Sequence, residues 1–274
     1  MKNFIGVMQG RLLPKYQGRY QAHPCGYWHQ EFPIAQSVGL NCIEFILDYD
    51  DAEKNPLMST TGIASIQQHI DETGVYVKTI CADYFMEAPL HSEVTDVANH
   101  SCDILNRLIV NGANLGVSDI VIPCVDQSSL RGVSATQRFV SRINSCLPTA
   151  KEHNINLSLE TDLAPEPFLE LLDQIGSEHV KVNYDIGNSA ALGYNPIEEL
   201  NTYGHLISDI HIKDRVLNGG PVVLGKGNAQ FKEFFDELAK FNYEGPFIMQ
   251  AYRDDEGVDI FKKQFAWISD FLKS

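Results

Sequence analysis

Four polar residues recur at the ends of apolar runs in the second half of the sequence. They are Glu160 in LSLETD, Asp185 in VNYDIGN, His211 in IHIKDR and Gln250 in FIMQAY, and they are separated by 25, 26 and 39 residues. Two carboxylates, one imidazole and one amide oxygen form a hard, oxygen-rich set of donors. Such a set suits Mn²⁺, Mg²⁺ or Co²⁺ and also accommodates Zn²⁺. The pattern therefore predicts a centre for one divalent metal ion.

Each of these residues also has a structural interpretation. An acid after a strand is often the N-cap of the next helix, and a single histidine is often a core residue with a hydrogen-bond partner. The recurrence of four candidate ligands, one after each of four apolar runs, favours the metal centre.

Short apolar runs rich in β-branched residues alternate with helix-periodic segments from end to end. Eight runs read as strands buried on both faces: 4–8, 41–47, 76–82, 119–124, 156–160, 180–185, 208–211 and 246–250. Helix signals lie between them, such as Ser59 before an apolar period that closes at Gly74, and the N-cap and proline pair Asn195-Pro196. Further helices are expected from the Phe-rich period that begins at Phe231 and over 257–272.

Eight strand–helix alternations in 274 residues give about 34 residues per unit, close to the size of one repeat of a parallel barrel. We therefore predict an α/β fold, a (β/α)₈ TIM barrel that forms one domain over residues 1–274. A doubly wound open sheet is the structural alternative, but no GxGxxG follows the first strand. In a barrel, the carboxyl ends of the strands meet at one mouth, where the four candidate ligands would converge.

The composition limits the functional classes. The chain has 36 acidic residues against 21 Lys and Arg, a formal net charge of −15, which argues against a nucleic-acid partner. Its six cysteines include no CxxC pair and are expected to be free thiols. No apolar run approaches a membrane span, and the N-terminal run is too short for a signal peptide. We expect a cytoplasmic enzyme for a small molecule, with a Phe-rich helix face that permits a homodimer.

Several motifs together resemble those of one superfamily. They are MQGRL at 8–12, SLETD at 158–162, NYDIGNS at 183–189, HIKDR at 211–215, LGKGNAQF at 224–231 and YEGPFIMQ at 243–250. Along its whole length the chain resembles the xylose isomerase-like TIM-barrel superfamily, which includes ketose 3-epimerases, hydroxypyruvate isomerase, inosose dehydratase and endonuclease IV. The resemblance implies that Glu160, Asp185 and His211 bind the metal and that Glu160 is also the catalytic base.

Gln250 departs from the pattern of the superfamily. Most members have a glutamate there, and in the epimerases that glutamate binds the metal and moves a proton. Gln250 still offers a carbonyl oxygen to a metal, but it cannot act as a base. Asp83, Asp126 or Glu44 could supply a second proton-transfer group from other strand ends.

The resemblance implies a sugar or sugar phosphate that reacts through a metal-chelated enediolate. Aldose–ketose isomerisation needs proton transfer on one face, whereas inversion of a stereocentre usually needs a group on each face. With Gln250 present, the sequence favours isomerisation over epimerisation. The alternatives are a lyase of the inosose-dehydratase type, a sugar-binding barrel without catalysis, and a phosphodiesterase like endonuclease IV, which the scarcity of strand-end histidines disfavours.

Polar residues near the ends of these runs are candidate substrate contacts that could hold a phosphate or carboxylate, or else be solvated or balance the carboxylates of the metal centre. They are Gln9, Arg11, Asn188, Lys213, Arg215 and Arg253. The aromatic-rich stretch 12–28 and the stretch 83–91 are long for strand-to-helix loops of a barrel. We expect each to form either a lid or a rigid packed loop. The loop histidines His23, His29 and His91 receive no role.

Overall fold

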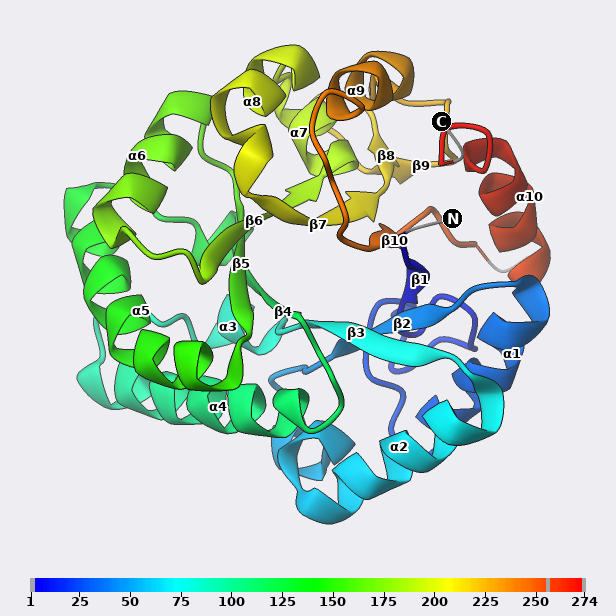
Figure 1. Cartoon of the computed structure of the whole chain (residues 1–274), viewed down its shortest axis with the longest axis horizontal. Helices are drawn as coiled ribbons and strands as arrows, with labels where there is room; N and C mark the ends of the chain where they lie inside the picture. Colours follow the sequence, from blue (N-terminus) through cyan, green and yellow to red (C-terminus); the bar gives the residue numbers. More distant parts are fainter. Residues whose placement is uncertain (1–2, 255–256, 273–274) are drawn as a thin grey trace.

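Eight parallel strands close into a barrel in the computed structural model, which describes residues 3–254 and 257–272. The order around the barrel is β1-β10-β7-β6-β5-β4-β3-β2, so neighbours in sequence are neighbours in space (Figure 1). The strands are β1 Ile5–Met8, β2 Cys42–Ile46, β3 Tyr76–Cys81, β4 Asp119–Cys124, β5 Asn156–Thr161, β6 Val180–Asp185, β7 Ile207–Ile212 and β10 Phe247–Met249. The predicted TIM barrel is confirmed, and the open sheet is excluded.

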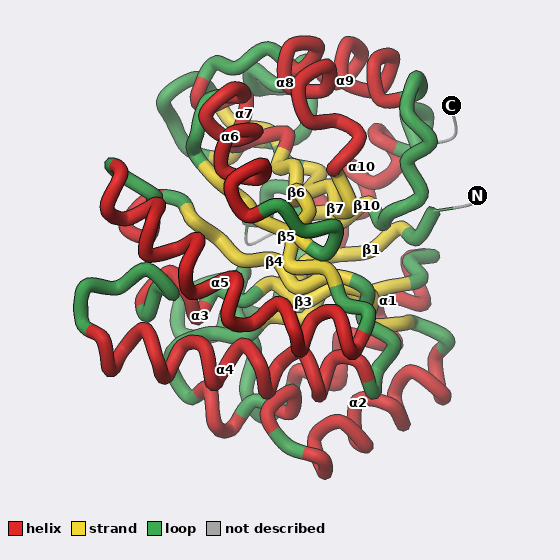
Figure 2. The backbone as a smooth tube through the Cα atoms, turned by 60° about the vertical axis from the view of Figure 1, so that its left-hand side comes forward, coloured by secondary structure: helices red, strands yellow, loops and turns green. Residues whose placement is uncertain are grey.

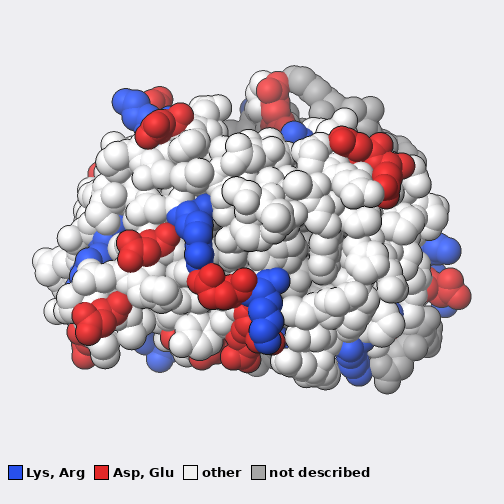
Figure 3. Space-filling model, turned by 90° about the horizontal axis from the view of Figure 1, so that it is seen from below, with Lys and Arg blue, Asp and Glu red and all other residues white. Residues whose placement is uncertain are grey.

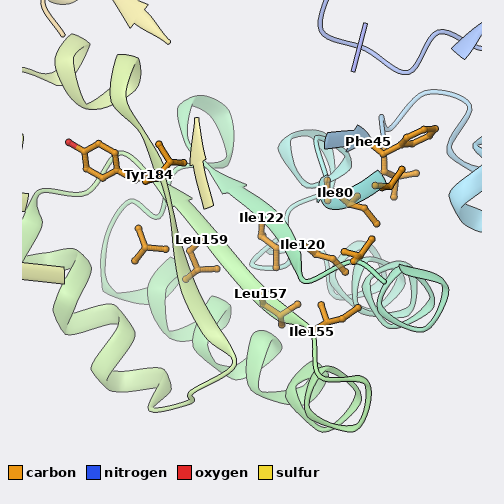
Figure 4. Packing of buried hydrophobic residues seen from close by; sticks show 14 of the residues in the cluster. Phe45, Ile80, Ile120, Ile122, Ile155, Leu157, Leu159 and Tyr184 are labelled. Carbon is orange, nitrogen blue, oxygen red and sulfur yellow. The ribbon is translucent and has the colours of Figure 1, made fainter. Parts of the chain in front are cut away.

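The apolar character of the strands follows from burial on both faces. All six residues of β4 are buried, and Ile120 and Ile122 pack with Leu157 and Leu159 of β5 in the layer between the sheet and the helices (Figure 4). Alternate residues, such as Val121 of β4, belong to a smaller apolar cluster with residues of other strands. This alternation decides which side chains can reach the interior and the mouth of the barrel.

Helices surround the strands, as Figure 2 shows. They are α1 Glu31–Val38, α2 Thr60–Thr73, α3 Tyr84–Glu87, α4 Thr95–Ala113, α5 Val133–His153, α6 Pro165–Ile175, α7 Ile186–Leu192, α8 Pro196–Tyr203, α9 Phe231–Leu238 and α10 Val258–Ile268. Five short 3-10 helices lie in the connections: η1 Trp28–Gln30, η2 Ala52–Lys54, η3 Pro56–Met58, η4 Asp126–Ser128 and η5 Gly204–Leu206.

The helix signals in the sequence are confirmed at several ends. Ser59 Oγ accepts a hydrogen bond from Gly62 N at 3.1 Å, and Gly74 ends α2 with a φ of 69°. Asn195 Oδ1 accepts from Ile197 N at 2.9 Å at the start of α8. The last helix is shorter than expected, because α10 ends at Ile268 rather than near residue 272.

A small antiparallel hairpin, β8 Asp214–Arg215 with β9 Pro221–Val222, follows β7 at the barrel mouth. Asp214 is fully buried and accepts hydrogen bonds from the backbone of Gly225, Gly227 and Ala229, at 2.9, 2.8 and 3.1 Å. These bonds fix the long connection to α9, so the residues at the start of the hairpin have a defined position.

The surface and the thiols agree with the composition. On the face seen in Figure 3, Lys and Arg side chains are interspersed with Asp and Glu rather than gathered into a basic patch. All six cysteines are free, and five of them are buried. Among the described residues, no helix is both long enough and apolar enough to cross a membrane.

Candidate metal centre

Glu160, Asp185 and His211 converge from the ends of three adjacent strands, β5, β6 and β7. Each offers one ligand atom, and these atoms all lie within 4.8 Å of one another. Asp185 and His211 are direct neighbours in the register between β6 and β7. All three side chains are buried, with relative exposures of 7%, 5% and 0%. The spacing of one strand–helix unit therefore places these residues together, as predicted.

The orientation of the His211 ring is set by Glu44 of β2, on the far side of the barrel. His211 Nε2 lies 2.8 Å from Glu44 Oε1. The other ring nitrogen, Nδ1, lies 3.9 Å from Asp185 Oδ2 and has no hydrogen-bond partner among the residues that the structure describes. A buried nitrogen without a partner is costly, and a metal ion is one ligand that satisfies it. Nδ1 is thus the atom of His211 that fits a metal.

Glu160 lies in surroundings that disfavour its charge. Burial and the nearby carboxylate of Asp185 raise the pKa of Glu160 to about 7. Asn188 Nδ2 donates a hydrogen bond to Glu160 Oε1 at 2.5 Å. A carboxyl group with a pKa near neutrality can both accept and return a proton, which is what a general base requires.

Asp185 combines the structural and the functional interpretation of the sequence. Its Oδ1 caps α7 by accepting a hydrogen bond from Asn188 N at 2.8 Å. Its Oδ2 lies near His211 and 3.3 Å from Lys213 Nζ. One oxygen therefore starts the helix while the other belongs to the ligand cluster.

Gln250 follows β10, the next strand around the barrel from β7. Its backbone N donates to Ile212 O at 3.0 Å, and its side chain is 3% exposed. Gln250 Nε2 donates to Gln21 Oε1 at 2.8 Å, whereas the buried Oε1 of Gln250 has no partner within residues 3–254 and 257–272. Gln250 lines the same cavity as Glu160, and its amide oxygen is of a donor type that hard divalent cations accept.

A cavity of about 790 Å³ opens above these residues. Glu160 and Gln250 line it, together with three of the predicted substrate contacts, Asn188, Lys213 and Arg215. Both long loops reach it, through Gln17, Arg19 and Gln21 of the first and through Asp83, Met86 and Glu87 of the second. The candidate metal centre is thus buried yet accessible to a small molecule from one side.

The model of the xylose isomerase-like TIM barrel family matches residues 32–271. The chain belongs to this family. A curated member from Salmonella paratyphi B, the L-ribulose-5-phosphate 3-epimerase UlaE, is 24% identical over 252 residues, which cover 87% of this chain and 86% of that protein.

Solved structures of other xylose isomerase-like barrels share the fold. The 3-keto-D-glucoside 4-epimerase YcjR of E. coli matches with a TM-score of 0.76 and 16% identity, over 98% of this chain and 99% of that chain. A D-psicose 3-epimerase solved in the presence of D-fructose matches with a TM-score of 0.75 and 18% identity, over 99% and 100%. Both matches show that the chain shares the barrel fold of these proteins.

Three predicted substrate contacts do not line the cavity. Gln9 is buried, and its Oε1 accepts from Ile46 N at 3.0 Å and lies 3.2 Å from His23 Nδ1. Arg253 donates to the backbone oxygen of Arg11 and covers the ring of Tyr20 at 4.5 Å. These residues hold the first strand–helix loop together, so their side chains have structural partners.

Two residues have contacts in this site that the sequence does not predict. Gln21 joins Gln250 to the first loop, and its Nε2 lies 3.3 Å from Asp83 Oδ2. Nothing in an irregular loop marks such a residue. Glu44 is one of the second proton-transfer groups that the sequence offers. In the structure it is fully buried beside His211 and does not line the cavity. The sequence signal for the buried position of Glu44 is a charged residue within the apolar run CIEFI.

Proposed function

We propose that this chain is a divalent-metal-dependent isomerase or epimerase of a sugar or sugar derivative, with Glu160 as its base. The observation that supports this proposal most directly is that Glu160, Asp185 and His211 converge beneath an open cavity. Within the described residues, His211 Nδ1 has no hydrogen-bond partner there. The names of the relatives support the same reaction class, since UlaE is a ketose-phosphate 3-epimerase.

In this proposal Glu160, Asp185, His211 and Gln250 hold one ion, of Mn²⁺, Mg²⁺, Co²⁺ or Zn²⁺. A bound divalent ion would supply Lewis-acid stabilisation of the charge that develops on the carbonyl and hydroxyl oxygens of an α-hydroxyketone. Glu160 removes the proton from the carbon that carries the hydroxyl and returns it to the former carbonyl carbon, while the hydroxyl proton passes to the former carbonyl oxygen.

Asn188 and Lys213 position this base and its neighbours. Asn188 donates to Glu160 and accepts from Lys213 Nζ at 3.2 Å and from Arg215 Nη1 at 2.8 Å. This chain of hydrogen bonds fixes the direction of the Glu160 carboxylate at the cavity floor. It also keeps two cations close to the two metal-binding carboxylates.

We favour proton transfer on one face, which corresponds to aldose–ketose isomerisation. The amide of Gln250 cannot act as a base, and Glu44 does not line the cavity. Asp83 and Asp126, the other two candidates from the sequence, do line the cavity. An epimerisation would therefore require one of these two loop carboxylates as its second group.

The test is proton exchange from solvent into a panel of ketoses and aldoses. The protein is loaded with Mn²⁺ and incubated in D₂O, and EDTA-treated protein is the control. We expect deuterium on the carbon next to the carbonyl, together with the isomeric sugar, only in the metal-loaded sample. Loss of water from the sugar would indicate the lyase instead. Absence of exchange over the whole panel would contradict the proposal and support a binding barrel.

A further inference from the structure

The wall of the cavity is rich in carboxylates well beyond the metal centre. Besides Glu160, the lining includes acids from the loops that follow β2, β3, β4 and β5, namely Asp48, Asp50, Asp83, Glu87, Asp126 and Asp162. Carboxylates accept hydrogen bonds from sugar hydroxyls, but they repel phosphate and carboxylate groups. The wall thus suits a ligand that offers many hydroxyl donors and no negative charge.

The three cations of the wall are already engaged by protein groups. Arg19 pairs with Asp48 at 3.1 Å, and Lys213 contacts both Asp185 and Asn188. Arg215 donates from Nε to Gly219 O at 2.9 Å and from Nη1 to Asn188. A phosphate group usually needs cationic donors that converge on it. Within the described lining, these cations instead serve the neighbouring carboxylate, amide and backbone oxygens.

The cavity is also large for one monosaccharide. Its volume of about 790 Å³ falls in the range, roughly 300–1,000 Å³, of pockets that enclose drug-sized ligands. Tyr49 lines this cavity with 49% of its surface exposed, and its ring lies 5.2 Å from that of Tyr84, which is buried. A supported, exposed aromatic ring is a suitable surface for the apolar face of a sugar.

We propose that the site takes an uncharged saccharide of more than one sugar ring. The reacting sugar unit lies over Glu160, and a further sugar ring packs on Tyr49 and donates hydrogen bonds to nearby carboxylates, such as Asp50. This inference rests on the proposed function for the position of the reacting ring. It names the substrate class of the same site.

The test is calorimetric binding to the Mn²⁺-loaded protein of three matched probes: fructose, lactulose (fructose with one more sugar ring) and fructose 6-phosphate. We expect lactulose to bind at least about tenfold more tightly than fructose, and the phosphate ester to bind less tightly than fructose. The deficit of the ester should shrink as NaCl rises from about 20 to 200 mM, because salt screens repulsion. Tighter binding of the phosphate ester than of fructose, weakening with salt, would overturn the proposal. Failure of all three probes to bind would overturn it as well.

Two sets of variants locate the effect. Tyr49→Ala should remove the advantage of lactulose over fructose, whereas Tyr76→Ala, at an exposed tyrosine outside the cavity lining, should leave it unchanged. The double variant Asp50→Asn with Asp126→Asn should raise the affinity for fructose 6-phosphate. An unchanged preference in Tyr49→Ala would contradict the subsite. Deuterium exchange with the same probes separates the substrate class from the proposed reaction. If the probes bind in the expected order but no deuterium is incorporated, only the proposed reaction is contradicted.

Discussion

Two regions at the barrel mouth contain buried charged groups, and they differ in how those groups are satisfied. One is the candidate metal centre of Glu160, Asp185 and His211, hereafter the metal centre. The other, here called the loop cluster, consists of Arg11, Glu31 and Arg253.

In the loop cluster, Glu31 accepts from Gly10 N at 2.8 Å and from Leu12 N at 2.9 Å, and Arg253 donates to the backbone of Arg11. Arg11 Nε is the one buried atom of this cluster without a partner. In the candidate metal centre, two predicted ligand atoms, His211 Nδ1 and Gln250 Oε1, have no hydrogen-bond partner among the described residues. Glu31 and Arg253 bond to backbone atoms, which indicates a role in folding, whereas two candidate ligand atoms of the other region remain available to bind an ion.

The largest expected effect is at the base. Glu160→Gln should lower the rate of deuterium exchange by about 10²–10⁴-fold, because the amide cannot accept a proton. Exchange rates in D₂O at saturating Mn²⁺ measure this. Glu170→Gln, at an exposed position of α6, is the matched control and should retain the wild-type rate. A Glu160→Gln protein with the rate of the control would remove Glu160 from the mechanism.

The loop cluster should respond in stability instead. Glu31→Ala leaves two backbone N–H groups without their acceptor, and we expect the free energy of unfolding to fall by about 2–4 kcal/mol. Urea unfolding measures this loss. The affinity of the folded variant for Mn²⁺ should stay within about threefold of the wild type. If metal affinity falls as far as stability does, the two regions are not separate in function.

The metal centre should also show a characteristic pH dependence. In the folded, metal-free protein the pKa of Glu160 is raised to about 7 from its ordinary value near 4.5, so the folded state holds a proton that the unfolded state has released between these values. The contribution to stability is therefore present below pH 4.5 and is lost as pH rises through 7.

Because the metal replaces that proton, Mn²⁺ affinity should rise by up to about tenfold per pH unit below pH 7. Calorimetry at several pH values, in buffers of different ionisation enthalpy, measures the affinity and the released proton together. A flat affinity between pH 5.5 and 7 would mean that Glu160 is not a ligand.

The smallest expected effect is at the fourth position. Gln250→Glu adds a carboxylate next to the other two and should tighten Mn²⁺ binding by roughly three- to tenfold, because ligand charge raises the affinity of oxygen-rich sites. Competition with a chelator measures the change. Weaker binding in this variant would show that Gln250 Oε1 does not face the ion.

Much of the fold was readable from the sequence because parallel strands buried on both faces leave continuous apolar runs. All eight runs became strands, with ends that differ by no more than two residues from those expected. The convergence of Glu160, Asp185 and His211 was also predictable, since a regular repeat brings equivalent strand ends together.

The hydrogen-bond partners of individual side chains could not be predicted from the sequence. The sequence predicts substrate contacts at Arg11 and Arg253 because they follow strands. In the structure Arg253 instead donates to the backbone of Arg11 and covers the Tyr20 ring, and Arg11 Nη2 donates to Gln21 Oε1 at 3.1 Å. Glu44 meets His211 across 167 residues of sequence, a contact that only closure of the barrel creates. Such long-range pairings depend on loop paths and on register, neither of which leaves a local pattern.

The central claim is that one divalent ion binds between β5, β6 and β7. Its most direct test is elemental analysis with Mn²⁺ titration of the wild type and of Asp185→Asn, which keeps an N-cap for α7. We expect about one ion per chain in the wild type and at least about 100-fold weaker binding in the variant, with unchanged helix content. No metal in either protein, or equal affinity in both, would contradict the account.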